Sequence, residues 1–300
     1  MRVVVLVNER SGFVRRSKLT AADIYGFVGA VGLEAEVKMV RSSALRFEAA
    51  EALRRGADVI AAGGGDGTIN TVASCLFGTS AALAVLPLGT FNHFAKDLGI
   101  PLDLESALRN IVTGKRHRID LGQVNDHIFV NNSSIGLYPH IVKRREGLRK
   151  KLQIDKFTAM VYATATIFRR FPVFKIKLSV DDREYEFDTP FVFVGNNEYS
   201  MDLFNLGTRE RLDGGQLCLY TTNCTGRLCL LRLALRLFFN KLEQSTHFSS
   251  KLVKELTLSS KRKKLRVSLD GEVARLVPPL RYRILPAALD VIVPVGKDDG

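Results

Sequence analysis

The stretch AAGGGDGTIN, residues 61–70, decides the fold. A mostly apolar run at 57–62 leads into its glycines, and residues 71–77 have the composition of a helix. This order predicts a buried strand, a glycine turn and the start of a helix. Glycines allow positive φ and let a ligand approach bare amides, and the helix N-terminus behind them offers free N–H groups to an anion. The stretch therefore predicts a phosphate-binding turn.

Asp66 gives this turn two interpretations. Its carboxylate could supply a hard oxygen ligand to a phosphate-bound Mg²⁺, or it could cap the helix of an ordinary strand-to-helix turn. The dinucleotide pattern G-x-G-x-x-G does not fit because residue 68 is threonine, and no Gly-Lys-Ser/Thr of a P-loop follows. The density of glycines favours phosphate binding.

A second strand and glycine turn follow at 82–95, where an apolar run leads into PLGTFNHFA, residues 87–95. The alternation of strands and helices continues to about Gly114 and predicts a three-layer α/β domain with a parallel sheet. In such sheets, ligands bind at the edge where the carboxyl ends of the strands meet. The predicted strands are 3–7, 34–40, 59–62 and 82–86, and the predicted helices are 20–31, 43–55 (capped by Ser42 or Ser43) and 71–77.

The second half of the chain has a different pattern. Short apolar or alternating runs between turn residues predict a β-sandwich. The predicted strands are 119–124, 128–131, 173–180, 183–187, 191–194, 216–220, 252–258, 265–269, 273–277, 281–284 and 289–293, with helices at 139–150, 155–171 and 226–242. We therefore predict a nucleotide-binding α/β domain over 1–118 and a β-sandwich domain over 119–300.

Composition limits the classes of protein that this chain can be. Its four cysteines have no CxxC spacing, so we expect reduced core thiols of a cytosolic protein. No signal peptide is recognisable, and no uncharged apolar run reaches the roughly 18 residues of a membrane-spanning helix. The net charge of +13 indicates a polyanionic partner: a nucleotide, an anionic membrane surface or a nucleic acid.

GGGDGTIN (63–70), PLGTFNHFA (87–95) and SLDGE (268–272), in this order, resemble the diacylglycerol kinase catalytic-domain family. That family includes bacterial lipid kinases, sphingosine kinases and ceramide kinases, and the resemblance covers nearly the whole chain. GGDGT alone has related versions in NAD kinases and phosphofructokinases; the second motif and the late Asp-Gly-Glu favour the lipid kinases. The resemblance implies an N-terminal α/β domain of the NAD kinase and diacylglycerol kinase type, a C-terminal β-sandwich, and an active site between them.

The resemblance also implies roles for individual residues. Glu272 would be the general base that removes a proton from the lipid hydroxyl as it attacks the γ-phosphate of ATP. Asp66 and Asp270 would be further catalytic carboxylates, with Asp66 also reaching the Mg²⁺ bound to ATP. The residues implied to hold ATP are Asn8, Ser11, Gly12, Ser42, Gly63, Gly64, Gly65, Asp66, Gly67, Thr68, Asn70, Gly89, Thr90 and Asn92.

Some positions leave alternatives open. Asp270-Gly271 is also the commonest hairpin signal, so an ordinary hairpin turn is the other interpretation of that motif. The family has a structural Mg²⁺ site on an Asp-Asp-Gly segment, but here the segment is LDGGQL, 212–217, with one carboxylate missing. If that site exists, Asp213 is its best ligand, with Glu210 nearby. The chain also departs from the family at Glu9, Thr71 and His93.

The basic residues are clustered. The predicted helix GRLCLLRLALRLFFNKL, 226–242, places Arg or Lys every four or five residues among leucines and phenylalanines. Such a helix can lie on an anionic membrane, or it can pack on the sandwich with a solvated cationic edge. Nucleic-acid binding is the rival explanation, but no zinc-finger spacing or RNP motif is present. The other basic clusters are 143–145 with 149–151, 169–170 and 261–264.

These features together predict a lipid kinase that depends on ATP and Mg²⁺ and phosphorylates a hydroxyl of diacylglycerol or a related lipid. We expect a cytoplasmic enzyme of phospholipid metabolism, peripheral to the inner face of the membrane, with a lipid substrate and no nucleic-acid partner. The oligomeric state is not determined, and a homodimer is one allowed state. The alternatives are a soluble-metabolite kinase related to NAD kinase, and a non-catalytic nucleotide- or lipid-binding protein.

Overall fold

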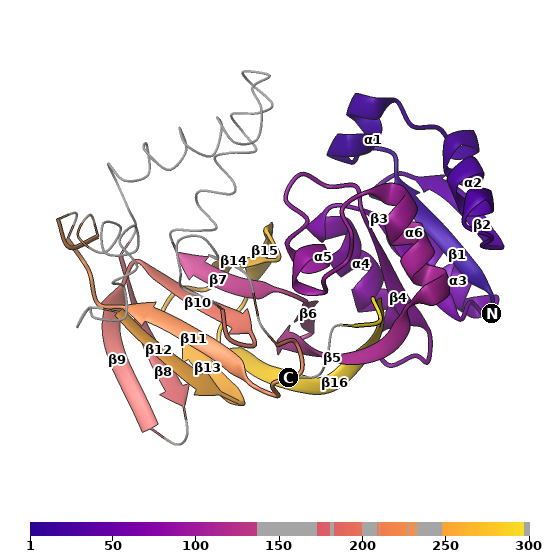
Figure 1. Cartoon of the computed structure of the whole chain (residues 1–300). Helices are drawn as coiled ribbons and strands as arrows, with labels where there is room; N and C mark the ends of the chain where they lie inside the picture. Colours follow the sequence, from indigo (N-terminus) through magenta and orange to yellow (C-terminus); the bar gives the residue numbers. More distant parts are fainter. Residues whose placement is uncertain are drawn as a thin grey trace. The chain divides into compact units, whose positions relative to one another are not determined.

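The computed structural model describes residues 1–136, 173–180, 183–199, 209, 211–226, 228–230, 232 and 248–296. These residues form two compact units, coloured along the sequence in Figure 1. The first unit comprises Met1–Leu121, Arg211–Asp213 and Pro286–Gly300, and the second comprises Gly122–Glu210 and Gly214–Leu285. Each unit therefore combines separate segments of the chain, whereas the predicted domains 1–118 and 119–300 are each one continuous segment.

The first unit contains a parallel sheet whose neighbouring strands are β2-β1-β3-β4. The bounds are Val3–Asn8 for β1, Ala35–Val40 for β2, Val59–Gly64 for β3 and Ala82–Pro87 for β4. Every residue of β1, β3 and β4 is buried. Burial on both faces explains why these strands appear in the sequence as continuous apolar runs rather than alternating ones. The predicted α/β architecture with a parallel sheet is confirmed.

Helices cover this sheet in two groups. α3 contacts α4 and β1, whereas α2 contacts α6 and β2. Thr20 and Asp23 form a capping box that starts α2. No side chain caps α3, so the predicted cap by Ser42 or Ser43 is wrong; Ser42 instead hydrogen-bonds Asn8. The helices are α1 (Gly12–Ser17), α2 (Ala21–Ala30), α3 (Leu45–Arg54), α4 (Asp66–Leu76), α5 (His93–Asp97) and α6 (Leu104–Thr113).

The second unit is a sandwich of two antiparallel sheets. One sheet has the order β12-β11-β10-β7-β14-β15, and the strands of the other follow the order β16-β13-β8-β9. Side chains from both sheets, such as Ile135 and Val267 from the first and Leu258 and Tyr282 from the second, share one core. The strands are β7 (Asn132–Gly136), β8 (Phe174–Val180), β9 (Arg183–Thr189), β10 (Phe191–Asn196), β11 (Leu217–Thr222), β12 (Phe248–Val253), β13 (Glu255–Ser259), β14 (Leu265–Leu269), β15 (Glu272–Leu276) and β16 (Leu280–Val293).

Two strands connect the units through the chain itself. β5 (Lys115–Val124) forms a hairpin with β6 (His127–Phe129), as predicted. β16 replaces the two predicted strands 281–284 and 289–293, and its last part pairs with β4 in the first unit. At Ala287, φ is +48° and the backbone N–H donates to Asp120 Oδ1 at 2.9 Å. The sequence between the two predicted strands is therefore a local irregularity in one strand and not a turn.

Some predicted elements differ or cannot be compared. The predicted strand 252–258 is two strands, β12 and β13, and β7 was not predicted. The predicted helices 139–150 and 155–171 lie outside the described residues, as does most of 226–242. Within the described part of the chain, no helix has the length and apolar character needed to cross a membrane.

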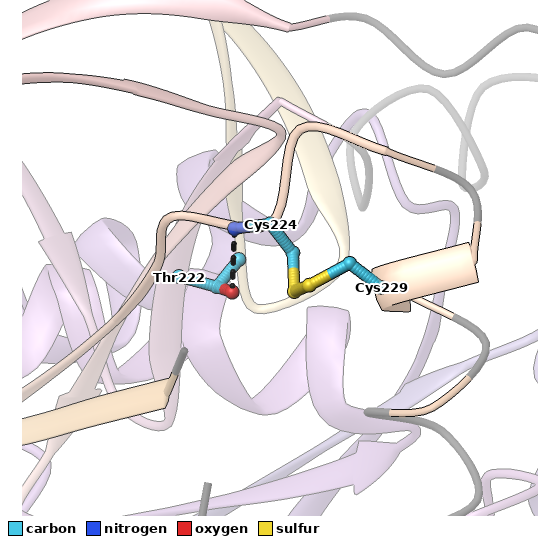
Figure 2. Close-up of a disulfide and its surroundings, with 3 residues drawn as sticks. All are labelled: Thr222, Cys224 and Cys229. Carbon is cyan, nitrogen blue, oxygen red and sulfur yellow. Dashed lines mark hydrogen bonds between the residues drawn. A yellow bond between two sulfur atoms is a disulfide. The ribbon is translucent and has the colours of Figure 1, made fainter. Parts of the chain in front are cut away.

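Cys224 and Cys229 form a disulfide, drawn in Figure 2. The prediction of four reduced thiols is therefore wrong for this pair. Their Cα atoms lie 5.5 Å apart, and the N–H of Cys224 donates to Thr222 Oγ1 at 3.2 Å. A five-residue separation matches no redox or metal motif, which is why the spacing did not indicate the bond. Cys75 and Cys218 are free, and burial raises the pKa of the Cys218 thiol to about 11.

Candidate active site

Three turns of the first unit meet at the carboxyl edge of its parallel sheet. The N–H of Phe13, after β1, donates to the carbonyl of Leu88, after β4, at 3.2 Å. A Cβ atom on Gly12 would lie 3.2 Å from Thr90 Oγ1, and one on Gly89 would overlap the Cα of Gly65. The motifs 8–12, 63–70 and 87–95 are thus brought together, as expected for the ends of neighbouring parallel strands.

These turns require glycine because a side chain would not fit between them. None of the glycines of the two motifs has a positive φ, so the expected left-handed conformation is absent there. A Cβ on Gly63 would lie 2.9 Å from Val7 Cγ2, and one on Gly64 would overlap the side chain of Thr68. The absence of side chains lets the turn after β3 approach β1 and the turn after β4 closely.

Several of the predicted ATP-binding residues hold the edge together. Asn8 Nδ2 donates to Thr68 Oγ1 at 2.9 Å and to Ser42 Oγ at 3.1 Å. Asn92 closes the second turn: its Oδ1 accepts from Gly89 N–H, and its Nδ2 donates to the Pro87 carbonyl, both at 2.9 Å. These polar side chains connect one turn to another or stabilise a turn, and so define the shape of the edge.

Other polar groups at this edge are available to a ligand. Within the part of the chain that the structure describes, Ser11 Oγ and Asn70 Oδ1 are buried without a hydrogen-bond partner. α4 starts after Gly65 with no side-chain cap, so its first N–H groups are not covered by a side chain. Asp66 is half-buried and does not cap α4; its Oδ1 accepts from the N–H of Phe94 at 3.3 Å. The Ser11 hydroxyl and the N-terminus of α4 can therefore donate hydrogen bonds to an anion, whereas Asn70 Oδ1 can accept one from a donor.

Exposed cations lie along the same turns. Arg10 and Arg41 are exposed, and Arg41 forms an ion pair with Glu9 at 3.4 Å. A guanidinium nitrogen of Arg16 would lie 3.4 Å from a Cβ on Gly12. A cluster of positive charge beside bare amides favours a polyanionic ligand. This edge therefore favours an anionic ligand.

In the second unit, Asp270 and Gly271 form the turn between β14 and β15, with φ of +47° and +85°. Positive φ at both central residues is the geometry of a tight two-residue hairpin. The predicted alternative, a hairpin turn, therefore describes the local backbone. Glu272 is exposed and is the first residue of β15. The turn presents Glu272 at the end of the sheet.

The Asp270 carboxylate accepts three backbone N–H groups, from Val130 at 2.7 Å and from Asn131 and Asn132 at 2.8 Å. Burial raises the pKa of Asp270 to about 6, although the three amides and Arg209 act in the opposite direction. Arg209 is buried and donates to the Val130 carbonyl and to Asn131 Oδ1. Asp270 thus anchors the hairpin. Nothing in the sequence around Arg209 marked it for this role.

Asp213 does not fit a structural Mg²⁺ site. Its carboxylate lies 3.2 Å from Arg211 Nε and 4.0 Å from His117 Nε2, so its near neighbours are cationic or basic groups. Among the residues that the structure describes, no group of three metal-ligating side chains occurs. Glu210, the predicted neighbouring ligand, lies outside the described residues.

Comparisons with known proteins point to one family. The model of the diacylglycerol kinase catalytic domain matches residues 2–124. A probable YegS-like lipid kinase of Klebsiella pneumoniae is 43% identical over 109 residues, 35% of this chain and 36% of the relative. A probable lipid kinase YegS of Salmonella gallinarum is 40% identical over 172 residues, 56% of this chain and 54% of the relative. The alignments with the first relatives span about a third of their length.

Solved structures show the same fold over more of the chain. A crystal structure of a diacylglycerol kinase from Bacillus anthracis str. Sterne superposes with a TM-score of 0.75 and 23% identity, covering 97% of this chain and 96% of that chain. The catalytic-domain match includes the turns at the edge of the first sheet, and the fold match extends through the second unit. Residues 2–124 therefore match the diacylglycerol kinase catalytic domain, and the chain has the fold of the solved diacylglycerol kinase structure.

Proposed function

We propose that this protein is an ATP-dependent lipid kinase that transfers the γ-phosphate of ATP to a hydroxyl of diacylglycerol or a related lipid. The observation that carries the proposal is the edge of the first sheet, where Ser11 Oγ and the uncapped start of α4 are available to donate to phosphate. This edge lies within the residues that match the catalytic-domain model. The match to the kinase catalytic domain supports the nucleotide as its ligand.

The first unit would hold ATP. The amides at the start of α4 and the Ser11 hydroxyl would donate to phosphate oxygens, while exposed Arg10 and Arg16 would offset the negative charge. Mg²⁺ carried by ATP would neutralise charge on the transferred phosphoryl group, and Asp66 would be the carboxylate that reaches it. Asn8, Thr68 and Asn92 would keep the turns in place through the hydrogen bonds described above.

Glu272 would act as the general base. It would take the proton of the acceptor hydroxyl as that oxygen forms a bond to the γ-phosphorus, while the bond from the γ-phosphorus to the bridging oxygen breaks and ADP leaves. Asp270 would be a positioning residue, because its carboxylate is already engaged by the amides of 130–132. The hairpin would thus hold Glu272 at a defined point.

The lipid acceptor would be taken from a membrane surface. The net charge of +13 favours anionic lipid. Of the basic clusters, Lys261–Lys264 is described, and its four side chains are exposed between β13 and β14. Binding to vesicles with and without anionic lipid tests this part of the proposal. Equal binding to both kinds of vesicle would contradict it.

The kinase assignment is tested by transfer of labelled γ-phosphate from ATP to a panel of lipids in mixed micelles, with NAD in a lipid-free reaction. Wild type should label one lipid class, and Glu272→Gln should lower kcat by about 10²–10⁴-fold. Glu184→Gln is the matched control, because Glu184 is an exposed carboxylate of the second unit, paired with Lys177. It should leave kcat unchanged.

The other outcomes separate the alternatives. Label in NAD without lipid would assign a soluble-metabolite kinase. ATP binding with no transfer to any lipid or to NAD would assign a non-catalytic nucleotide-binding protein. Label in a lipid that persists in Glu272→Gln would retain the kinase but remove Glu272 as the base.

A further inference from the structure

Residues 130–132, which lead into β7, are held on one side by a buried carboxylate. Asp270 accepts the three N–H groups of this segment, and the Asp270 N–H donates to the Asn132 carbonyl at 2.9 Å. Hydrogen bonds from amides to a charged carboxylate are among the stronger ones in proteins. The carbonyl oxygens and the Asn131 side chain on the other side of the segment need donors of their own.

Arg209 supplies donors on that other side. One guanidinium nitrogen donates to the Val130 carbonyl at 2.8 Å and to the Asn196 carbonyl at 3.0 Å, and a second donates to Asn131 Oδ1 at 2.7 Å. The guanidinium also lies over the ring of Tyr199, with 5.4 Å between Cζ and the ring centroid. Arginine suits this position because its planar fork of donors is always charged and binds several oxygen atoms at once.

The charge of Arg209 is enclosed by the second unit. The residue is only 3% exposed. Burial raises the pKa of Asp270, and the nearby charge of Arg209 acts in the opposite direction. A buried charge is costly unless it is paired and hydrogen-bonded, and removing one partner leaves the other buried without compensation. A buried cation and a buried carboxylate therefore hold residues 130–132 together.

Strand pairing connects this segment to Glu272. Ser133, the next residue along the chain, pairs with Leu269 of β14, and Leu269 pairs with Glu272 of β15. These three residues form one row across neighbouring strands, and Asp270 lies in the two-residue turn between the last two. A displacement of 130–132 would therefore displace the hairpin and Glu272 with it.

We infer that Arg209 is a positioning residue for the transfer step: with Asp270 it holds residues 130–132, and through them it fixes the hairpin that presents Glu272 to the acceptor hydroxyl. The inference rests on the proposed function and adds a residue to it. Arg209 belongs to the second unit, whereas ATP is proposed to bind the first. Its loss should therefore lower kcat and leave the KM for ATP unchanged.

The test measures transfer to lipid in wild type, Arg209→Ala and Arg209→Lys. Arg209→Ala should lower kcat by about 10–100-fold, because it releases the segment that positions Glu272. Added guanidinium ion should restore part of this kcat by donating to the same oxygen atoms, at concentrations well below the molar range that unfolds proteins. Arg209→Lys should be intermediate, since one ammonium group cannot reproduce the fork of donors.

Arg275→Ala is the matched control, because Arg275 is an exposed arginine on the strand that begins with Glu272. It should keep the wild-type kcat with and without guanidinium. Equal kcat in wild type and Arg209→Ala would overturn the inference, and so would a loss that guanidinium leaves unchanged. If Arg209→Ala does not fold, Arg209→Lys decides: a lowered kcat with an unchanged KM for ATP supports the inference, and an unchanged kcat overturns it.

Hydrogen exchange of the 130–132 amides, measured without ATP or lipid, separates this inference from the proposed function. These amides should exchange slowly in wild type and faster in Arg209→Ala, and guanidinium should restore the slow exchange. If this pattern is found but wild type transfers no phosphate, Arg209 still holds the segment and the proposed function fails. If wild type transfers phosphate but exchange is equal in the two proteins, the inference fails and the kinase stands.

Discussion

At the scale of single residues, Asp270 shows opposing effects on one carboxyl group. Three backbone amides and Arg209 stabilise its charged form, but burial acts more strongly and raises its pKa from 3.8 to about 6. The residue was predicted as a catalytic carboxylate, whereas its contacts are those of an anchor. Its protonation should therefore be visible in the stability of the protein.

A raised folded-state pKa fixes the sign of that pH dependence. The folded protein keeps the Asp270 proton between pH 3.8 and about 6, where the unfolded chain has lost it. The contribution of the protonated Asp270 to the free energy of unfolding is fully present below pH 3.8 and is lost as the pH rises through about 6. Its size is on the order of 3 kcal/mol at most. The difference in unfolding free energy between wild type and Asp270→Asn, measured by denaturant titration, should fall over this interval. A difference that rises with pH would mean that the amides outweigh burial.

The glycines of the phosphate-binding turns give a second prediction for single residues. Gly89→Ala should destabilise the protein by about 1–3 kcal/mol, because its Cβ would overlap Gly65 and lie 2.6 Å from Asn92 Oδ1. Gly29→Ala is the matched control: it lies inside α2, and a Cβ there meets nothing within 4 Å. That change should stabilise by about 0.5–1 kcal/mol. Thermal unfolding checks both; equal effects would refute the steric reason.

At the scale of elements, a polar side chain caps a helix only where it has no other hydrogen-bond partner. Thr20 is free to cap α2 and forms a reciprocal capping box with Asp23. Ser42 precedes α3 in sequence but bonds Asn8 of β1. A capping signal in the sequence therefore predicts a cap only where no tertiary partner competes for the hydroxyl.

This difference is measurable. Thr20→Ala should lower the free energy of unfolding by about 1 kcal/mol, because it removes the bonds to the Asp23 backbone and side chain. Ser43→Ala should change it by no more than about 0.5 kcal/mol, since α3 has no side-chain cap. Chemical denaturation of the two variants gives both values. A loss at Ser43 as large as that at Thr20 would contradict the assignment of the caps.

At the scale of the whole molecule, β16 makes the first unit depend on the end of the chain. Leu289, Val291, Ile292 and Val293 are buried there, and Val291 pairs with Leu83 of β4. A domain boundary drawn at 118 would leave this unit without these side chains. The unit is built from residues at both ends of the sequence.

Truncation after Leu285 should therefore unfold the first unit. Loss of four buried side chains, each contributing about 1.5–3 kcal/mol, is comparable to the whole stability of a domain. Limited proteolysis should cleave the first unit of the truncated chain and leave that of the full chain intact. Val295→Ala, at a 71% exposed position, should have no effect. A protease-resistant first unit in the truncated chain would contradict this dependence.

The local sequence pattern predicted an element correctly where a single local effect, such as burial or glycine sterics, determines that element. Continuous apolar runs identified β1, β3 and β4 because these strands are buried on both faces. The two glycine motifs indicated the turns at the sheet edge because a Cβ would not fit there. In contrast, β7 was not predicted: the sequence NSSIG alternates only weakly, and its serines depend on neighbouring strands for their surroundings.

The sequence by itself determined the parallel sheet of the first unit, the β-rich second unit and the turns that carry the phosphate-binding motif, because these follow from periodicity and from glycine sterics between near neighbours. Only the tertiary structure decided that Cys224 bonds Cys229, that β16 completes the first unit and that Arg209 and Asp270 hold residues 130–132. β16 and the hydrogen bonds of Arg209 and Asp270 join residues far apart in the chain, and the five-residue separation of the two cysteines matches no motif that indicates a bond. Local sequence pattern does not indicate which residues that are far apart in the chain come into contact.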